Sequence, residues 1–196
     1  MKRVSKGAIR KACVIVGACL LTAAVVLLSA WQVNIRISEK KAKEYVDTIY
    51  KLIPKPQGAV VAQRSDNTMP ALSVDGKDFV GILEMPRYES AQPVCASWGS
   101  ISKTPCRFSG SIYDRTMLLG ATTQKGQYDF YREICVGDSV LFTDMAGNRY
   151  SYAVTDVRYT KSADRDTLYR EDASLTLFIK NVYAVEYIIV YCDEVA

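Results

Sequence analysis

Apolar residues follow two different patterns along this chain. From Ala12 to Ile35 the sequence carries no charge and reads ACVIVGACLLTAAVVLLSAWQVNI, which exceeds the roughly 20 residues that a helix needs to cross a hydrocarbon core. Beyond residue 71, apolar residues gather instead in short segments between turn signals. The first pattern predicts a transmembrane helix over residues 12–35, and the second predicts an all-β domain over residues 71–196.

A second helical pattern lies between these two parts, in the region 36–70. Apolar residues recur at helical spacing from Ser38 to Ile53, with Ser38 as the expected N-cap and Pro54 as the stop. The residues that follow, up to Pro70, are polar and contain Gly and Pro, which is typical of a linker. The apolar stripe favours a helix that packs on the outer domain, although a plain stalk would show the same helix.

Six segments of the remaining chain are rich in Val, Ile, Leu, Tyr and Phe and read as strands. They are residues 79–85, 116–122, 138–144, 149–159, 175–179 and 186–192. Turn signals stand at Asp75-Gly76, Gly137-Asp138 and 146–148. Residues 162–173 are charged and predict a short helix or an exposed loop. Many strands and few helices indicate a β-barrel or sandwich.

The charge distribution suggests an orientation for the membrane helix. Five basic residues precede Ala12, and the rest of the chain is nearly neutral, with 20 basic against 21 acidic residues. A basic N-terminal flank, residues 1–11, predicts a cytoplasmic tail and an extracellular globular domain. A cleaved signal peptide is the alternative, but its apolar region would be shorter than this run. The near-neutral remainder lacks the basic face that a nucleic-acid partner would need.

The six cysteines fall into two groups. Cys13 and Cys19 lie in the apolar run, and Cys95, Cys106, Cys135 and Cys192 lie in the outer part, where disulfides persist. The chain has no histidine and no C-x-x-C pair, so we expect no metal site, and no cofactor either. Cys95 and Cys106 enclose ten residues of a loop-like stretch and are the disulfide candidate. The alternative is that all four outer cysteines are reduced or simply buried.

Five segments, in this order, resemble the sortase family of Gram-positive cysteine transpeptidases, in particular clostridial-type members. They are VDGKDFVGILEMP (74–86), PVCASWGSISKTPCRFSGS (93–111), TMLLGAT (116–122), VGDSVLFTDMAGNRYSYAV (136–154) and LTLFIKNVYAVEYIIVYC (175–192). The resemblance implies an eight-stranded sortase β-barrel with short helices, preceded by a transmembrane helix and an amphipathic helix. It also implies a groove that binds peptide sorting signals.

The same resemblance shows where the chemistry of the family is missing. Family members carry a histidine, a nucleophilic cysteine after LTLF and an arginine; the matching positions here are Thr122, Lys180 and Tyr187. A shift of one residue would place Ala121 or Glu186 there instead. The loss of the histidine does not depend on the alignment, because the chain has none. The chain therefore offers no obvious residue for thiolate attack or for proton transfer by an imidazole.

Three interpretations of function follow. In the first, the protein is a membrane-anchored pseudoenzyme that uses Thr122, Lys180 and Tyr187 to bind a sorting-signal peptide, a pilin or an active sortase. In the second, it is an active transpeptidase with a relocated catalyst, for example Cys192. In the third, the barrel is a non-catalytic scaffold of the cell envelope. The fold alone does not choose between them, because function is carried by the site.

Overall fold

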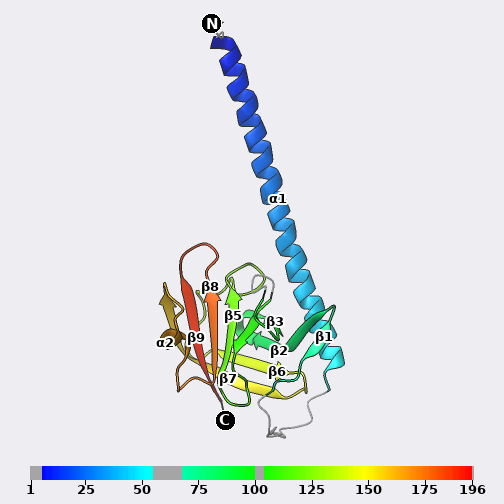
Figure 1. The fold of residues 1–196 in the computed structure, drawn as a ribbon, viewed down its shortest axis with the longest axis vertical. Helices are drawn as coiled ribbons and strands as arrows, with labels where there is room; N and C mark the ends of the chain where they lie inside the picture. Colours follow the sequence, from blue (N-terminus) through cyan, green and yellow to red (C-terminus); the bar gives the residue numbers. More distant parts are fainter. Residues whose placement is uncertain (1–5, 55–67, 100–103, 196) are drawn as a thin grey trace. The chain divides into compact units, whose positions relative to one another are not determined.

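The computed structural model describes residues 6–54, 68–99 and 104–195 (Figure 1). The chain divides into two compact units, residues 1–37 and 38–196. The first unit is entirely helical in its described part. The second unit holds the end of the helix and all the strands. Most of the predicted linker, residues 55–67, lies outside the described residues.

Helix α1 (Lys6–Leu52) contains both helical segments that the sequence predicts. Its stretch from Cys13 onward is long and apolar enough, by length and composition, to cross a membrane. The prediction that Ser38 is an N-cap is wrong, because the helix runs through this residue. Between residues 32 and 44 the sequence contains neither Gly nor Pro, so nothing there interrupts the helical hydrogen bonds.

The last part of α1 packs on the barrel unit, as its apolar stripe predicts. The cluster consists of Tyr45, Val46, Ile49, Ile53, Phe79 and Ile82. The rings of Tyr45 and Phe79 have centroids 5.2 Å apart. Ile49 has no exposed surface, and burial of a side chain of this size contributes about 1.5–3 kcal/mol. This contact explains why residues from Ser38 onward belong to the second unit.

In the described part of the chain nine strands follow the helix, with two short helical segments between them. The strands are β1 (Leu72–Val74), β2 (Lys77–Met85), β3 (Ser90–Cys95), β4 (Cys106–Ser109), β5 (Met117–Thr122), β6 (Ser139–Asp144), β7 (Arg149–Thr160), β8 (Leu175–Lys180) and β9 (Tyr187–Glu194). A 3₁₀ turn, η1 (Pro86–Tyr88), follows β2, and helix α2 (Arg165–Leu168) lies between β7 and β8. The charged segment 162–173 thus contains a short helix, as expected.

Eight of the strands form a closed barrel. The order is β2-β3-β4-β5-β8-β9-β7-β6, and a pairing of β2 with β6 closes the ring, while β1 adds to β2. The pairings β3–β4 and β5–β8 are parallel and the others are antiparallel. Figure 1 shows β8 between β5 and β9. The predicted eight-stranded barrel is therefore confirmed.

Alternate residues of each strand fill the barrel. Tyr152 and Val154 of β7 lie in the main core cluster, and Tyr150 packs against it, so these alternating residues share one face. Cys192 of β9 is part of the same cluster and is 1% exposed. The inward positions of β5, β8 and β9 include Ala121, Ile179 and Ile188. Their neighbours along each strand therefore point to the outer face.

The strand pattern missed three short strands. β3 contains Pro93, which lacks an amide hydrogen and argues against a central strand. β4 has four residues, and its pairing with β3 consists of the single pair Cys95–Cys106. β1 has only three residues. Cys95 and Cys106, which the sequence predicts to flank a loop, are the paired ends of two strands, and the described residues between them form neither helix nor strand.

The predicted turn at Asp75-Gly76 is confirmed. It joins β1 to β2, with Val74 paired to Lys77. Asp75 has φ 51° and Gly76 has φ 72°, which is the backbone of a type I′ hairpin turn and explains the Asp-Gly sequence.

Candidate functional site

The three positions that the resemblance to sortases singled out lie in one row. Thr122, at the end of β5, is the register partner of Lys180 at the end of β8. Lys180 is in turn the register partner of Tyr187, the first residue of β9. Directly paired residues of neighbouring strands share a face of the sheet. Because the residues next to them point into the barrel, this row lies on the outer face.

The three side chains of the row differ in what they offer to a ligand. Thr122 is buried, and its hydroxyl donates a hydrogen bond to Oε1 of Gln127 at 3.0 Å. The same oxygen accepts the Thr122 backbone amide at 3.1 Å, so Thr122 anchors the segment that follows β5. Lys180 is exposed and Tyr187 is half-buried. The two residues that reach solvent in the row are therefore Lys180 and Tyr187.

A rigid turn follows the row and carries exposed apolar side chains. Asn181 is buried, and its Nδ2 donates to Glu186 at 3.1 Å and to the hydroxyl of Tyr131 at 3.4 Å. Its Oδ1 accepts the backbone amide of Tyr183 at 2.9 Å. This network fixes the β8–β9 turn. Three exposed apolar residues lie on it, namely Val182, Tyr183 and Val185.

An aromatic cluster covers the outer face next to the row. Gly120 and Phe178 are register partners, two residues before Thr122 and Lys180. Trp98, from the segment between β3 and β4, stacks on Phe178 with ring centroids 5.5 Å apart. Phe108 of β4 meets Trp98 edge-on at 5.0 Å. Trp98 and Phe108 are each 46% exposed, so the cluster presents an apolar platform beside Lys180.

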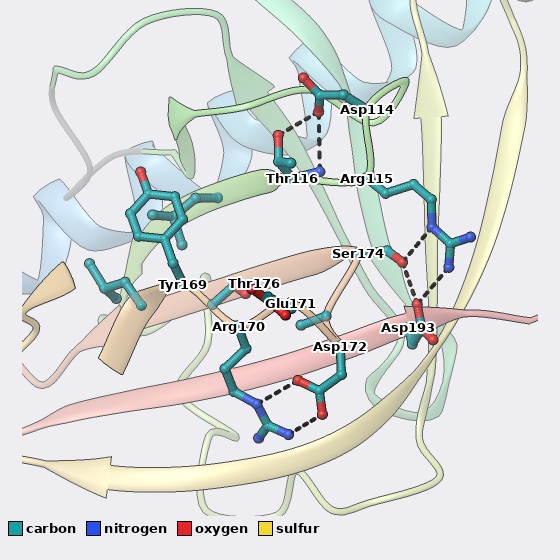
Figure 2. Close-up of a pocket in the computed structure, with 13 residues that line it drawn as sticks. Asp114, Arg115, Thr116, Tyr169, Arg170, Glu171, Asp172, Ser174, Thr176 and Asp193 are labelled. Carbon is teal, nitrogen blue, oxygen red and sulfur yellow. Dashed lines mark hydrogen bonds and ion pairs between the residues drawn. The ribbon is translucent and has the colours of Figure 1, made fainter. Parts of the chain in front are cut away.

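A cavity of about 370 Å³ opens at the opposite end of the same strands (Figure 2). Its walls come from three segments that are distant in the sequence, 114–118, 168–176 and Asp193. The Ser109 and Tyr169 hydroxyls, 2.6 Å apart, join β4 to the segment after α2.

Both arginines of the cavity are paired with carboxylates of the protein. Figure 2 shows Arg115 reaching Ser174 and Asp193; its Nη2 lies 3.0 Å from Oδ1 of Asp193. The hydrogen bond from Ser174 is the main cause that lowers the pKa of Asp193. Arg170 pairs in the same way with Asp172 and lowers the pKa of that carboxyl. Sequence reasoning missed this cavity, because no local motif brings its three segments together.

The outer cysteines occupy other positions than the row, although Cys106 pairs with Gly120, two residues before Thr122. Cys192 is buried among apolar side chains, and burial raises its pKa to about 12. Cys135 is exposed, and its sulfur accepts a hydrogen bond from Nη1 of Arg87 at 2.8 Å. Cys95 and Cys106 are free thiols that face each other across β3 and β4. Among the described residues, no thiol lies in the row of Lys180, and no cluster of three or more Cys, Asp or Glu side chains is arranged to hold a metal ion.

Comparison of the structure with solved structures identifies the fold. No family model matches the chain, and no curated protein matches it in sequence. Sortase C from Clostridium perfringens SM101 is similar over 80% of this chain and 99% of its own, with a TM-score of 0.54 and 14% identity. A Clostridium perfringens sortase C solved with its C-terminal cell wall sorting motif covers 67% of this chain and 78% of its own, at TM-score 0.53 and 16% identity. The chain has a sortase-like fold.

Sortases of another type show the same fold. Sortase A from Corynebacterium diphtheriae is similar over 83% of this chain and 84% of its own, with a TM-score of 0.52 and 11% identity. In the sortase-like fold of the present chain, the outer face of β5, β8 and β9 carries the row, the aromatic cluster and the cavity. These features are the basis of the functional proposal.

Proposed function

We propose that this protein is a membrane-anchored pseudoenzyme whose extracellular sortase-like domain binds a peptide segment without transpeptidation. The observation that carries the proposal is the row itself. The strands that would bear a sortase triad are in register, yet the positions hold Thr122, Lys180 and Tyr187. The scaffold is complete, and the groups needed for thiolate attack and imidazole proton transfer are replaced.

The chemistry of the row suits a peptide. The Lys180 ammonium can donate to a carboxylate or a peptide carbonyl, and charge-assisted hydrogen bonds are the stronger kind. Tyr187, the apolar β8–β9 turn and the platform of Trp98 and Phe108 offer surface for apolar side chains. A sorting-signal peptide, an exposed segment of a pilin, or a segment of an active sortase would present these groups. The aromatic cluster lies on the same face, two residues before Lys180, so the ligand is proposed to bind at this end of the face.

The surroundings of Cys192 do not suit a relocated cysteine catalyst. Cys192 points into the barrel, where no substrate reaches it, and its raised pKa keeps it protonated at neutral pH. Cys135 is exposed beside Arg87 but lies in a different part of the barrel, outside the row. Lys180 cannot form a thioester in place of the missing cysteine.

A titration tests the binding proposal. The full chain in detergent micelles is titrated with sorting-signal peptides by calorimetry or NMR, alongside the Lys180→Met variant. Loss of a hydrogen bond to a charged group costs about 1.5–3 kcal/mol, so we expect Kd to rise about tenfold or more. The matched control is Lys51→Met, an exposed lysine in the last turn of α1, which should leave Kd unchanged.

The scaffold interpretation is the second candidate, and one observation favours it. Trp98 covers Gly120 on the face where the groove of the family is expected. If Trp98 closes this face and the face binds no ligand, sorting-signal peptide at millimolar concentration should release no heat in calorimetry and shift no NMR signal near Lys180. That result would contradict the binding proposal and favour the scaffold.

A further inference from the structure

Cys95 and Cys106 are the only residues through which β3 and β4 pair. Direct partners on neighbouring strands lie about 4.8 Å apart, within the range of roughly 4.4–6.8 Å that a disulfide requires between Cα atoms. Both thiols also contact Thr104. The Cys95 sulfur lies 2.9 Å from its hydroxyl oxygen, and the Cys106 sulfur donates to its carbonyl at 3.4 Å.

The two thiols are not equivalent. Cys95 is partly exposed, whereas Cys106 is 1% exposed. A hydrogen bond from the Cys106 thiol lowers the pKa of Cys95, although burial opposes this shift, and the Thr104 hydroxyl and the charge of Lys77 add to it. The same contact raises the pKa of Cys106. An accessible thiol that ionises easily, beside a buried thiol that does not, is the arrangement of an attacking and a resolving cysteine.

Two aromatic residues close to these cysteines lie on the outer face of the barrel. Trp98 follows Cys95 by three residues and stacks on Phe178, while Phe108 follows Cys106 by two and packs on Trp98. Arg107, next to Cys106, donates through Nε to the carbonyl of Ala96 at 3.2 Å. A covalent link at the base of the segment would therefore restrain both ends of the aromatic cluster.

We propose that Cys95 and Cys106 form a thiol–disulfide exchange site whose oxidation fixes Trp98 over Gly120 and Phe178. The oxidant is a disulfide, either a small one such as oxidised glutathione or that of a partner protein. This inference goes beyond peptide binding and does not depend on it. The expected attacking residue is Cys95, because it is the one of the pair that an external disulfide can reach.

The exchange balances in two steps. The Cys95 thiolate attacks one sulfur of the external disulfide, whose S–S bond breaks; a mixed disulfide forms, and one thiolate leaves and takes up a proton. The Cys106 thiol then loses its proton and attacks the Cys95 sulfur. The Cys95–Cys106 bond forms, and the second external thiolate leaves and is protonated. The pair has lost two electrons and two protons, and the external disulfide has become two thiols.

The experiment uses the full chain in detergent micelles, with Cys13→Ala, Cys19→Ala and Cys135→Ser to remove the other accessible thiols. The protein is equilibrated across ratios of reduced to oxidised glutathione, quenched with acid, alkylated and mapped by mass. We expect one internal disulfide, Cys95–Cys106, reversed by a dithiol reductant, and a melting temperature about 5 °C or more above that of the reduced form.

Single substitutions separate the roles of the two cysteines. Cys106→Ser should trap one glutathione on Cys95, and Cys95→Ser should remain unmodified because Cys106 is buried. Glutathione on Cys106 in the Cys95→Ser variant, or no internal disulfide at the most oxidising ratio, would overturn the proposal. The two serine variants are matched controls for each other, since each removes one sulfur from the same pair.

A fluorescence measurement tests the link to Trp98. In a Trp31→Phe background Trp98 is the one tryptophan left. We expect acrylamide quenching of its fluorescence to fall about twofold on oxidation and to recover on reduction. Equal quenching in the two redox states would show that oxidation does not restrain Trp98. The existence of the exchange site is tested separately, by the disulfide mapping.

Discussion

Trp98 occupies the space that a side chain at position 120 would need. A Cβ atom at Gly120 would lie 2.3 Å from Cζ3 of Trp98 and 2.7 Å from Cζ of Phe178. Glycine is therefore required here for close packing rather than for an unusual backbone, because its φ is not in the left-handed region. This contact holds the aromatic cluster on the outer face next to Lys180.

The first prediction follows from this contact. Gly120→Ala should displace Trp98 and lower the free energy of unfolding by about 1–3 kcal/mol, because a methyl group is forced into a filled space. In a Trp31→Phe background the emission of Trp98 should shift to the red. Gly99→Ala is the matched control, since the nearest atom to its Cβ is 3.9 Å away. An unchanged emission spectrum in Gly120→Ala would contradict the packing.

A second prediction concerns chemistry. The wild-type protein should show no thiol-dependent cleavage or transpeptidation of sorting-signal peptides, and Lys180→Cys alone should add none, because catalytic residues that act as a unit are strongly non-additive. A peptide-cleavage assay on both proteins checks this. Steady wild-type turnover that disappears in Cys192→Ala or Cys135→Ser would support an active enzyme instead.

Restoration of the full triad meets a structural obstacle at Thr122. Its buried hydroxyl and amide both donate to Gln127, and a histidine there would break the hydrogen bond of the hydroxyl and exceed the available space. The Thr122→His, Lys180→Cys, Tyr187→Arg variant should therefore be less stable than the wild type, and its folding must be measured before its activity is interpreted.

The third prediction concerns thiol reactivity. Iodoacetamide at pH 8 should label Cys135 in the folded protein and leave Cys192 unlabelled, because Cys135 is exposed and the pKa of Cys192 is raised to about 12 by burial. Mass mapping of the labelled protein, with and without denaturant, gives the order in which the two cysteines react. Labelling of Cys192 as fast as that of Cys135 would show that the barrel opens readily.

The fourth prediction concerns pH. Asp138 is buried, and burial alone would raise its pKa; hydrogen bonds from Tyr88, the Cys135 amide and Arg87 outweigh this and lower it to about 2. The folded pKa lies below the unfolded value of about 3.9, so the stabilisation is present above pH 4 and is lost as the pH falls from 4 toward 2.

The substitution Asp138→Asn tests this pH dependence. At pH 6 the variant should unfold about 1–3 kcal/mol more easily than the wild type, since it loses hydrogen bonds to a charged group. The difference should shrink below pH 4 in urea titrations. If the difference in free energy of unfolding between the two proteins stays constant from pH 6 to pH 2, the carboxylate charge contributes nothing to stability.

The fifth prediction concerns orientation in the membrane. The basic residues before Ala12 predict a cytoplasmic N-terminus and an outer barrel. Protease treatment of intact cells should remove an epitope placed after Ala196 and spare one placed before Lys2. The opposite pattern would reverse the orientation.

The sequence predicts the barrel well where strands are long and alternate. The segments of β7 and β8 could be recognised from their residues alone, and so could the Asp75-Gly76 turn. Strand β3 could not, because its pairing with β2 outweighs the unfavourable Pro93. Ser38 has the chemistry of an N-cap, yet the helical residues on both sides continue the helix through it.

The register of the three candidate positions could be predicted from the sequence, but their surroundings could not. Motif resemblance identified Thr122, Lys180 and Tyr187, and strand register brings the three together. The aromatic cluster and the cavity depend on contacts between residues that are far apart in the sequence, such as that between Ser109 and Tyr169. No local pattern of residues encodes such contacts.

The parallel pairing of β5 with β8 has a consequence for the order of folding. β8 and β9 are joined by a short turn, so Lys180 and Tyr187 can meet as soon as a local hairpin forms. Thr123 and Asn181, which tie β5 to this hairpin, are 58 residues apart in the sequence. Contacts between such distant residues form later, because closing a long loop of chain costs conformational entropy. We therefore expect Thr122 to join its two partners late, at the step that closes the barrel.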